Sequence, residues 1–512
     1  MKSSEIAPSA PRKNTAPLLL LLLIALAVRG GVLFTSLSSL NDDPDAYAQL
    51  ADNWYSYGVF GDKTQATAFR PPLYPWLLKE LVWIQSAQDR ARFAKRGNAL
   101  SERESAKARQ SKAAAVRENL SLSRNASIAF LHWLLGMLTV AMVYKLARLS
   151  NLPPGWSVCA GLLVAFDPIL LQQSRLVMTE TLAAFFAAAL ILGTTLCVQN
   201  RKSRFRWMLF LFLGALFGLS TLCRPAFFAF AGLVFLGLVF VEIKNSFADA
   251  VVLPGLFLVG VALAVSPWLL RNLREFDKPI LTTTHGGYTL YLANNPELYR
   301  HYENTPAWTL WNPEEFHERR TEEYGQALES AGFLAGSKEA ELFQDRWTRE
   351  KALETIKGNR QTFLYSCALR AGELWRVLPN DVPDKEPRGV KRSLSGQIKT
   401  YARYAIALFY TWEFFFAALA LISLAITSCR SMKKQSKEAP PCRSIAAFGT
   451  TPLFWGVLLV LSVQIPHLFY WTNMRMRAPL EVFVPIVAIL GVHTLKQLFF
   501  TQSSKTKNTE KQ

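Results

Sequence analysis

Apolar runs recur along the whole chain, and most are about 20 residues long, enough for a helix to cross the roughly 30 Å hydrocarbon layer of a membrane. The runs are continuous and do not alternate between apolar and polar residues, which favours helices and argues against a membrane β-barrel. Ten runs are found, at about residues 16–36, 126–147, 155–172, 178–198, 207–223, 226–242, 250–270, 403–427, 450–468 and 477–498. The predicted fold class is an all-α polytopic membrane protein with about ten transmembrane helices.

The composition supports a membrane protein. Of 512 residues, 51% are hydrophobic and 19% are charged, whereas soluble proteins carry about 25% charged residues. The net charge of +19 is explained by basic residues that flank the spans, so nucleic acid is not an expected partner and membrane lipids are. The first run, "LLLLLLIALAV", has no small-residue cleavage site close behind it and is expected to stay as a helix.

Basic loops predict the orientation, because lysine and arginine are enriched on the cytoplasmic side. The segments 201–206 and 430–443 hold four and five basic residues, and the C-terminal tail adds lysines. If these segments are cytoplasmic, ten spans place residues 37–125 and 271–402 outside. We therefore predict a multi-pass membrane protein, and in the cytoplasmic (inner) membrane of a bacterium these two segments would face the periplasm.

The insertion 87–124 opposes this orientation. It contains ten Lys or Arg residues and four acids, which is typical of a solvated helix or a disordered insertion. On charge alone it would be cytoplasmic, but the preceding run begins with two prolines and includes Lys79 and Glu80. We expect an interfacial amphipathic helix at 72–86, and the side and role of the insertion stay open.

The chain divides into four predicted parts. A transmembrane core covers 1–270 and includes the first outer loop 37–125. A periplasmic segment follows at 271–402, in which 277–312 is expected to be an irregular loop and 313–378 to be helical. C-terminal transmembrane helices at 403–500 and a disordered cytoplasmic tail at 501–512 complete the chain.

Charged residues gather at the predicted outer ends of the spans, where few are expected. They are Asp42, Asp43, Asp45, Arg70, Arg175, Glu180, Arg224, Arg271, Arg274, Arg475 and Arg477. A single arginine at a span end is usually an anchor that reaches the membrane surface. Several arginines with several carboxylates instead indicate an anionic ligand and a proton acceptor, because ionisable groups at membrane depth are costly and guanidinium binds phosphate through two parallel hydrogen bonds.

Group transfer from a lipid phosphate fits these residues. A carboxylate can take the proton of an acceptor hydroxyl as it attacks the sugar carbon. The phosphate leaving group gains negative charge, which arginines can offset without a metal. We see no His, Asp or Glu spacing typical of a metal site, so no metal is predicted.

Several segments resemble, in order, signatures of the GT-C glycosyltransferase superfamily, and most closely the bacterial branch that includes lipid A aminoarabinose transferases and protein O-mannosyltransferase relatives. The resemblance covers most of 16–300 and returns at 475–490. The segments are "NDDPDAYAQLADNWYSYGVFG…AFRPPLYPW", "RLVMTETLAAFF", "GLSTLCRP", "SPWLLRN" and "NMRMRAPLEVFVPIVA". Singly each is weak, but their order is specific.

The resemblance implies roles for individual residues. The catalytic base of the family lies four residues before an aromatic residue, which implies Asp43 before Tyr47, with Asp45 as second choice and Asp42 as third. Family members often have an acid directly after the base, where this chain has Pro44. The resemblance further implies that Arg70 contacts the donor phosphate and that Glu180 lies near the acceptor or sugar. Phosphate or pyranose contacts are implied for Arg224, Arg271, Arg475 and Arg477.

The same resemblance implies an inverting transfer from a polyprenyl-phosphate-linked monosaccharide to a lipid, glycan or protein acceptor, without a nucleotide sugar or other cofactor. We expect His132 to be a hydrogen-bonded packing residue, His285 to have a loop role and Asp167 to end a helix before Pro168. The alternative is a transporter or flippase of lipid-linked sugars, although such proteins usually have polar or broken helices at mid-membrane. The sugar, the acceptor and the oligomeric state are not predicted.

Overall fold

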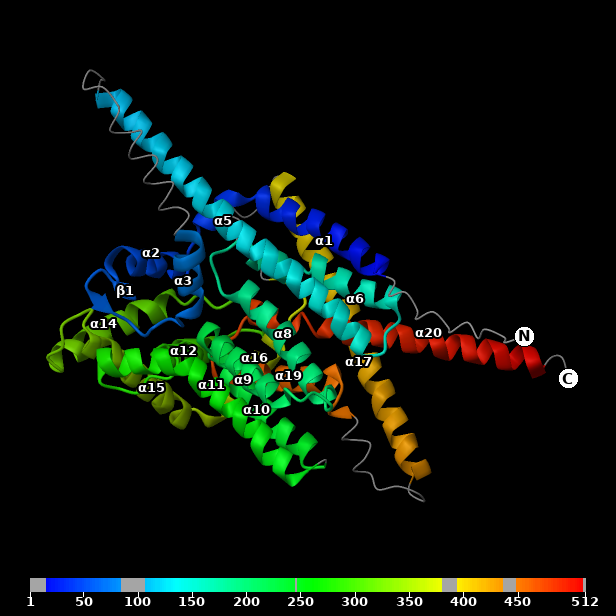
Figure 1. The fold of residues 1–512 in the computed structure, drawn as a ribbon. Helices are drawn as coiled ribbons and strands as arrows, with labels where there is room; N and C mark the ends of the chain where they lie inside the picture. Colours follow the sequence, from blue (N-terminus) through cyan, green and yellow to red (C-terminus); the bar gives the residue numbers. More distant parts are fainter. Residues whose placement is uncertain (1–14, 84–105, 245, 380–393, 436–447, 510–512) are drawn as a thin grey trace.

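The computed structural model describes residues 15–83, 106–244, 246–379, 394–435 and 448–509. These residues form a bundle of helices that carries a smaller group of helices at one end (Figure 1). Within the described ranges the strands are one short antiparallel pair, β1 Gly61–Asp62 and β2 Gln65–Ala66. The predicted all-α class is confirmed.

The helices of the bundle match the ten apolar runs. Seven described helices are long and apolar enough to cross a membrane: α1 Ala16–Phe34, α5 Ala106–Leu149, α8 Glu180–Gln199, α9 Arg206–Cys223, α11 Phe247–Phe276, α17 Leu394–Gln435 and α19 Pro452–Phe469. A bent pair passes the same test only when its two helices are taken together: the 3-10 helix η3 Met474–Leu480 is followed after a 69° bend by α20 Val484–Thr509, as in a broken span or a re-entrant loop. The remaining two runs form shorter apolar helices, α6 Pro154–Phe166, which α7 Pro168–Gln173 follows, and α10 Ala226–Glu242.

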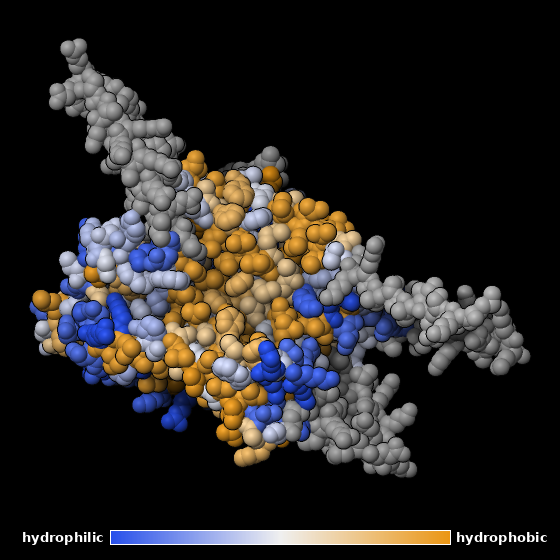
Figure 2. Space-filling view, viewed as in Figure 1, coloured by the Kyte–Doolittle hydropathy of each residue, from blue (hydrophilic) through white to orange (hydrophobic). Residues whose placement is uncertain are grey.

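The surface of the bundle fits a membrane environment. A broad apolar region covers its side, between more hydrophilic surfaces (Figure 2). Large exposed apolar side chains come from the apolar helices, for example Leu23, Phe212 and Leu236. Because lipid offers no hydrogen-bond partners, such segments must satisfy their backbone groups internally, which explains why these runs form helices.

Glycines allow α9 and α11 to pack with their backbones in close contact. A Cβ atom on Gly214 would lie 1.9 Å from the carbonyl oxygen of Phe257, and one on Gly260 would lie 2.1 Å from that of Leu211. Small residues at helix crossings are the common device for close packing in membranes, where apolar surface alone does not drive helices together.

We expect Gly260→Ala to lower the yield and the thermal stability of folded protein, because the added methyl group requires the two helix backbones to separate. Gly255→Ala is the matched control, since it makes the same change on α11 with no atom within 4 Å of the added Cβ. Thermal unfolding in detergent measures both. Equal stability of the two variants would contradict the close packing of α9 and α11.

The group of helices at the end of the bundle has two parts. The first part follows α1 and precedes α5 in the sequence. It contains the 3-10 helix η1 Leu37–Asn41, α2 Tyr47–Tyr57, α3 Leu73–Leu77 and the π-helix η2 Leu78–Trp83. The second part lies between α11 and α17 and contains α12 Gly286–Ala293, α13 Pro296–Asn304, α14 Glu314–Ser330, α15 Lys338–Gly358 and α16 Arg360–Leu374.

The predicted helical segment at 313–378 is confirmed, whereas the prediction of an irregular loop at 277–312 was wrong because that range includes α12 and α13. The side chain of Asn295 accepts a hydrogen bond from the backbone N–H of Leu298, and Pro296 begins α13. This pairing of an asparagine cap with a following proline is a helix start.

Two other expectations concern the ends of segments. Residues 106–124 of the basic insertion belong to α5, and 87–105 lie outside the described residues. The C-terminal tail was predicted to be disordered from about Thr501, but α20 is helical through Thr509. A helix that has already formed extends at little cost, because each added residue contributes one hydrogen bond.

Glu341 of α15 connects the two parts of the end group. Its carboxylate accepts hydrogen bonds from the Thr67 hydroxyl (2.7 Å), the Ala68 backbone N–H (2.9 Å) and the Thr284 hydroxyl (2.5 Å). The backbone N–H of Thr284 also donates to the carbonyl of Ala68 (3.0 Å). These bonds hold the loop that ends in Phe69 and Arg70.

Candidate active site

Asp43 lies between η1 and α2, where one of its oxygens caps a helix. Oδ2 accepts hydrogen bonds from the backbone N–H groups of Ala48 (2.9 Å) and Gln49 (3.1 Å) in the first turn of α2. A helix N-terminus favours a carboxylate in this position. Oδ1 is buried and has no hydrogen-bond partner among the described residues. One oxygen therefore orients the carboxylate, and the other is available to accept a proton.

The surroundings of Asp43 make it a stronger base than an exposed aspartate. Burial raises the pKa of this carboxyl, while the helix N–H groups and the positive charge of Arg124 oppose the rise. A base with a raised pKa binds a proton more readily near neutral pH. Arg124 of α5 donates to the side chain of Asn41 (3.1 Å). It was not among the residues predicted from the sequence.

Arg70 and Asp45 form an ion pair beside Asp43. Nη2 of Arg70 lies 2.8 Å from Oδ1 of Asp45, and both side chains are 20% exposed. The guanidinium also lies over the rings of Tyr47, at 5.9 Å, and Phe69, at 5.3 Å. Asp45 is therefore placed to orient Arg70, whereas the free oxygen of Asp43 is the better proton acceptor.

His285 lies next to this ion pair. Its ring contacts Phe69 edge-on at 4.3 Å. Burial, and then the charge of Arg70, lowers the pKa of His285 to about 3, so the imidazole is neutral at pH 7. Its Nδ1 is buried without a hydrogen-bond partner among the described residues. The sequence alone favoured a loop role for His285, but its neighbours are residues of the candidate site.

Glu180 forms a second charged group with two arginines. It is the first residue of α8 and only 1% exposed, and its Oε1 lies 3.6 Å from Nη1 of Arg224 and 3.9 Å from Nε of Arg475. The two arginines also donate to thioether sulfur atoms, Arg224 to Met476 and Arg475 to Met178. Sulfur is a weak acceptor. Two guanidinium groups around one carboxylate therefore offer an excess positive charge and strong donors to an anionic ligand.

Tyr47 and Tyr74 connect the two charged groups. Their rings pack edge-on at 5.5 Å, and both side chains are buried. Burial raises the pKa of Tyr47, on which the charges of Arg70, Asp45, Glu180 and Arg224 also act. Burial also raises the pKa of Tyr74, and the negative charges of Asp43 and Glu180 raise it further. Charges of both groups therefore act on this tyrosine pair, which makes the two groups one candidate site.

His132 supports Tyr74 from inside the bundle. Its Nδ1 lies 2.7 Å from the carbonyl oxygen of Ser174, and its Nε2 lies 2.8 Å from the Tyr74 hydroxyl. A carbonyl only accepts, so Nδ1 carries the proton and Nε2 accepts from the tyrosine. The predicted role of His132 as a hydrogen-bonded packing residue is confirmed. Tyr74 itself was not predicted as part of the site.

Three predicted site residues are not brought into this group. Asp42 is exposed, and its backbone carbonyl accepts from the N–H of Val177. Arg477 is fully buried and donates to Glu481 and to the carbonyl oxygens of Leu374 and Arg376. Arg271 donates to backbone carbonyls that include that of Thr67, at 2.8 Å.

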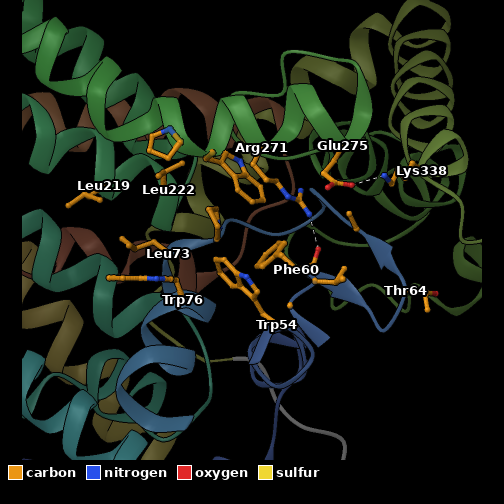
Figure 3. A pocket seen from close by; sticks show the side chains of 16 residues that line it. Trp54, Phe60, Thr64, Leu73, Trp76, Leu219, Leu222, Arg271, Glu275 and Lys338 are labelled. Carbon is orange, nitrogen blue, oxygen red and sulfur yellow. Dashed lines mark hydrogen bonds and ion pairs between the residues drawn. The ribbon is translucent and has the colours of Figure 1, made fainter. Parts of the chain in front are cut away.

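Arg271 lines a separate cavity of about 610 Å³ next to the loop that carries Arg70 (Figure 3). Aromatic side chains, among them Trp54, Phe60 and Trp268, form much of its wall. An ion pair between Lys338 and Glu275, at 2.6 Å, lies at one end. An apolar wall with charged groups at one end suits an amphipathic molecule such as a lipid.

Comparison with known proteins agrees with the resemblance seen in the motifs. Residues 115–276 match the model of the family dolichyl-phosphate-mannose-protein mannosyltransferase. The match covers 162 of the 512 residues, about a third of the chain, and shows a similarity to that family over this part. A search of curated protein sequences gives no match.

Solved structures with a similar arrangement include archaeal oligosaccharyltransferase AglB from Archaeoglobus fulgidus in complex with an inhibitory peptide and a dolichol-phosphate. It is 13% identical, with a TM-score of 0.46, over 96% of this chain and 51% of that one. A second structure of the oligosaccharyltransferase from the same organism, with Zn and sulfate, is 14% identical, with a TM-score of 0.46, over 94% and 50% of the two chains. The chain thus spans about half the length of these proteins.

Proposed function

We propose that the protein transfers a monosaccharide from a polyprenyl-phosphate donor to a hydroxyl or similar group on a lipid, glycan or protein acceptor, with inversion. The reaction would take place at the periplasmic face of a bacterial cytoplasmic membrane. The observation that carries the proposal is the buried Oδ1 of Asp43, which has no hydrogen-bond partner among the described residues and belongs to the same site as the cations Arg70, Arg224 and Arg475.

In the proposed reaction, Asp43 takes the proton of the acceptor hydroxyl through Oδ1 as the acceptor oxygen attacks the anomeric carbon. The bond from that carbon to the phosphate oxygen breaks, and its electron pair goes to the phosphate. Arg224 and Arg475, with Arg70, offset the growing negative charge, so no metal is assigned to this step. A single displacement inverts the anomeric carbon, and the cavity beside Arg271 would take part of the lipid chain.

In vitro transfer tests the proposal. Purified full-length protein in detergent would receive a panel of radiolabelled polyprenyl-phosphate monosaccharides, with membrane lipid, glycan and peptide fractions as acceptors. We expect label to move from one donor to one acceptor fraction. Label that stays on every polyprenyl donor although the donors bind would reject a transferase, and movement of donor across vesicle membranes would then indicate a flippase.

Substitutions of Arg70 test the phosphate contact. We expect Arg70→Ala to lower kcat/KM for the donor more than Arg70→Lys, because lysine keeps the charge but loses the planar pair of donors. Loss of a charge-assisted hydrogen bond to the leaving group would reduce kcat by about 10²–10³-fold in the alanine variant. Near-normal kinetics for both variants would contradict a role of Arg70 at the phosphate.

A further inference from the structure

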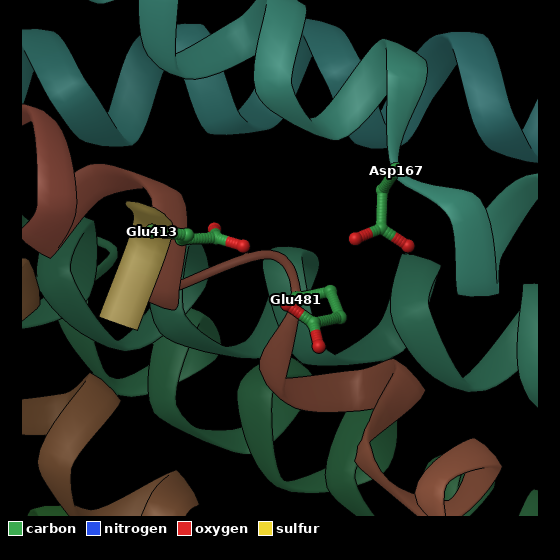
Figure 4. Close-up of side chains that lie close together, drawn as sticks. All are labelled: Asp167, Glu413 and Glu481. Carbon is green, nitrogen blue, oxygen red and sulfur yellow. The ribbon is translucent and has the colours of Figure 1, made fainter. Parts of the chain in front are cut away.

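Three carboxylates meet inside the bundle, away from the candidate active site. Asp167 lies at the break between α6 and α7, Glu413 lies within α17, and Glu481 lies at the bend between η3 and α20 (Figure 4). Each side chain is fully buried, and one oxygen from each lies within 4.8 Å of the others. From the sequence, Asp167 was predicted only to end a helix, and this cluster was not predicted.

The partners of the cluster leave several oxygens unused. Asp167 caps α7 through the N–H of Leu170 (2.7 Å) and accepts from the Tyr410 hydroxyl (3.1 Å). One oxygen of Glu481 accepts from Arg477. The other oxygen of Glu481 and both oxygens of Glu413 are buried without a hydrogen-bond partner among the described residues. Figure 4 shows the Glu413 carboxylate directed toward the other two.

Positive charge in the described residues does not balance the three acids. Arg477 contacts Glu481 and lies over the rings of Tyr410 and Phe414. Arg29 of α1 donates a hydrogen bond to the carbonyl of Val164. Its charge acts on Asp167, but these two described residues form no ion pair. Burying an ionised carboxylate without a partner costs several kcal/mol. An ionised Glu413 therefore needs a further positive group, and without one this carboxyl would hold a proton.

We propose that Asp167, Glu413 and Glu481 bind one Ca²⁺ ion inside the bundle. Calcium prefers carboxylate oxygens at about 2.3–2.6 Å, so two ligands on opposite sides of the ion can lie roughly 5 Å apart. The spacing of up to 4.8 Å between the oxygens fits this ion. Magnesium holds its ligands at about 2.0–2.1 Å, so two ligands on opposite sides of that ion would lie roughly 4 Å apart.

The ion would connect three elements that are distant in the sequence. It would join the break after α6, the middle of α17 and the bend before α20. Because η3 carries Arg475 toward Glu180 and Arg477 toward Glu481, the ion would also hold the orientation of η3 at the candidate active site. This role is separate from the transfer chemistry and does not depend on the proposed function.

Metal analysis of the purified full-length protein tests the site. The protein would be stripped by prolonged dialysis against a chelator, reloaded with Ca²⁺ or Mg²⁺ and washed, and its metal content and thermal unfolding measured in detergent. We expect about one Ca²⁺ per chain, held more tightly than Mg²⁺, and a higher unfolding temperature with Ca²⁺. Glu413→Gln and Asp167→Asn should lose both effects, and the latter keeps the oxygen that caps α7.

Two control variants locate the ion. Glu242→Gln removes a carboxylate that is equally buried but paired with Arg206, and Asp43→Asn alters the candidate active site. Both should keep the bound Ca²⁺. A wild-type protein with neither bound ion nor Ca²⁺-dependent unfolding would overturn the proposal in favour of protons on the cluster. Wild-type Ca²⁺ content in Glu413→Gln would place the ion elsewhere and overturn it as well.

Discussion

Asp43→Asn should reduce sugar transfer by at least about 10²–10⁴-fold, the usual contribution of a positioned general base. Asparagine keeps the oxygen that accepts from Ala48 and Gln49, so α2 stays capped and the fold should be retained. The amide cannot take the proton of the acceptor at neutral pH. The measurement is the single-turnover rate with saturating donor, beside the donor affinity, which should change little.

Neighbouring acids serve as controls for this variant. Asp42→Asn should keep near-normal rates, because Asp42 is exposed. Asp45→Asn should act mainly through the donor, because Asp45 holds Arg70. If Asp43→Asn turned over normally and Asp45→Asn were inactive, the base would be Asp45 and the assignment from the free oxygen of Asp43 would be wrong.

The dependence of transfer activity on pH is a second test of Asp43 as the base. Only the ionised form of Asp43 can accept the proton, so activity should fall as the pH drops through its raised pKa. Because Arg124 lowers this pKa, Arg124→Gln should move the acidic limb of kcat/KM to higher pH. An unchanged limb would mean that another group controls it.

Arg477→Met should destabilise the folded protein by about 3–5 kcal/mol, because it leaves buried carboxylates without their contacting cation. Methionine fills a similar volume, so the expected loss comes from charge and from the hydrogen bonds to Glu481, Leu374 and Arg376. The yield of monodisperse protein and the unfolding temperature measure it.

Arg475→Met is the matched control, two residues away on the same 3-10 helix. Arg475 is 33% exposed in its side chain and faces Glu180, so the variant should fold and lose transfer activity. Two variants with equal unfolding temperatures would show that Arg477 does not balance the buried acids, and the division of roles between the two arginines would fail.

The ten apolar segments could be predicted from the sequence because a membrane leaves few choices: an apolar run of sufficient length must form a helix. The grouping of Asp43, Tyr47 and Arg70 could also be predicted from the sequence, because these residues lie close together in the chain. The helices α12 and α13 were missed because their Thr, Gly and Asn residues suggest a loop, although Asn295 and Pro296 mark a helix start.

Contacts between distant segments were beyond sequence reasoning. Glu413 is a single acid within an apolar helix, and its meeting with Asp167 and Glu481 depends on how three helices pack. From the sequence "RMR" alone, Arg475 and Arg477 cannot be told apart and would be taken as two equivalent cations. Only the geometry shows that one is directed to the candidate site and the other to the bundle interior.

Because η3 is a 3-10 helix, the number of its residues determines the direction in which each of its side chains points. Successive residues of a 3-10 helix are about 120° apart around the axis, so positions 475 and 477 point in different directions. One residue inserted between Arg475 and Arg477 would turn Arg475 away from Glu180 while Glu481 still holds Arg477. The number of residues in this short helix, and not only their chemistry, therefore determines whether the site is complete.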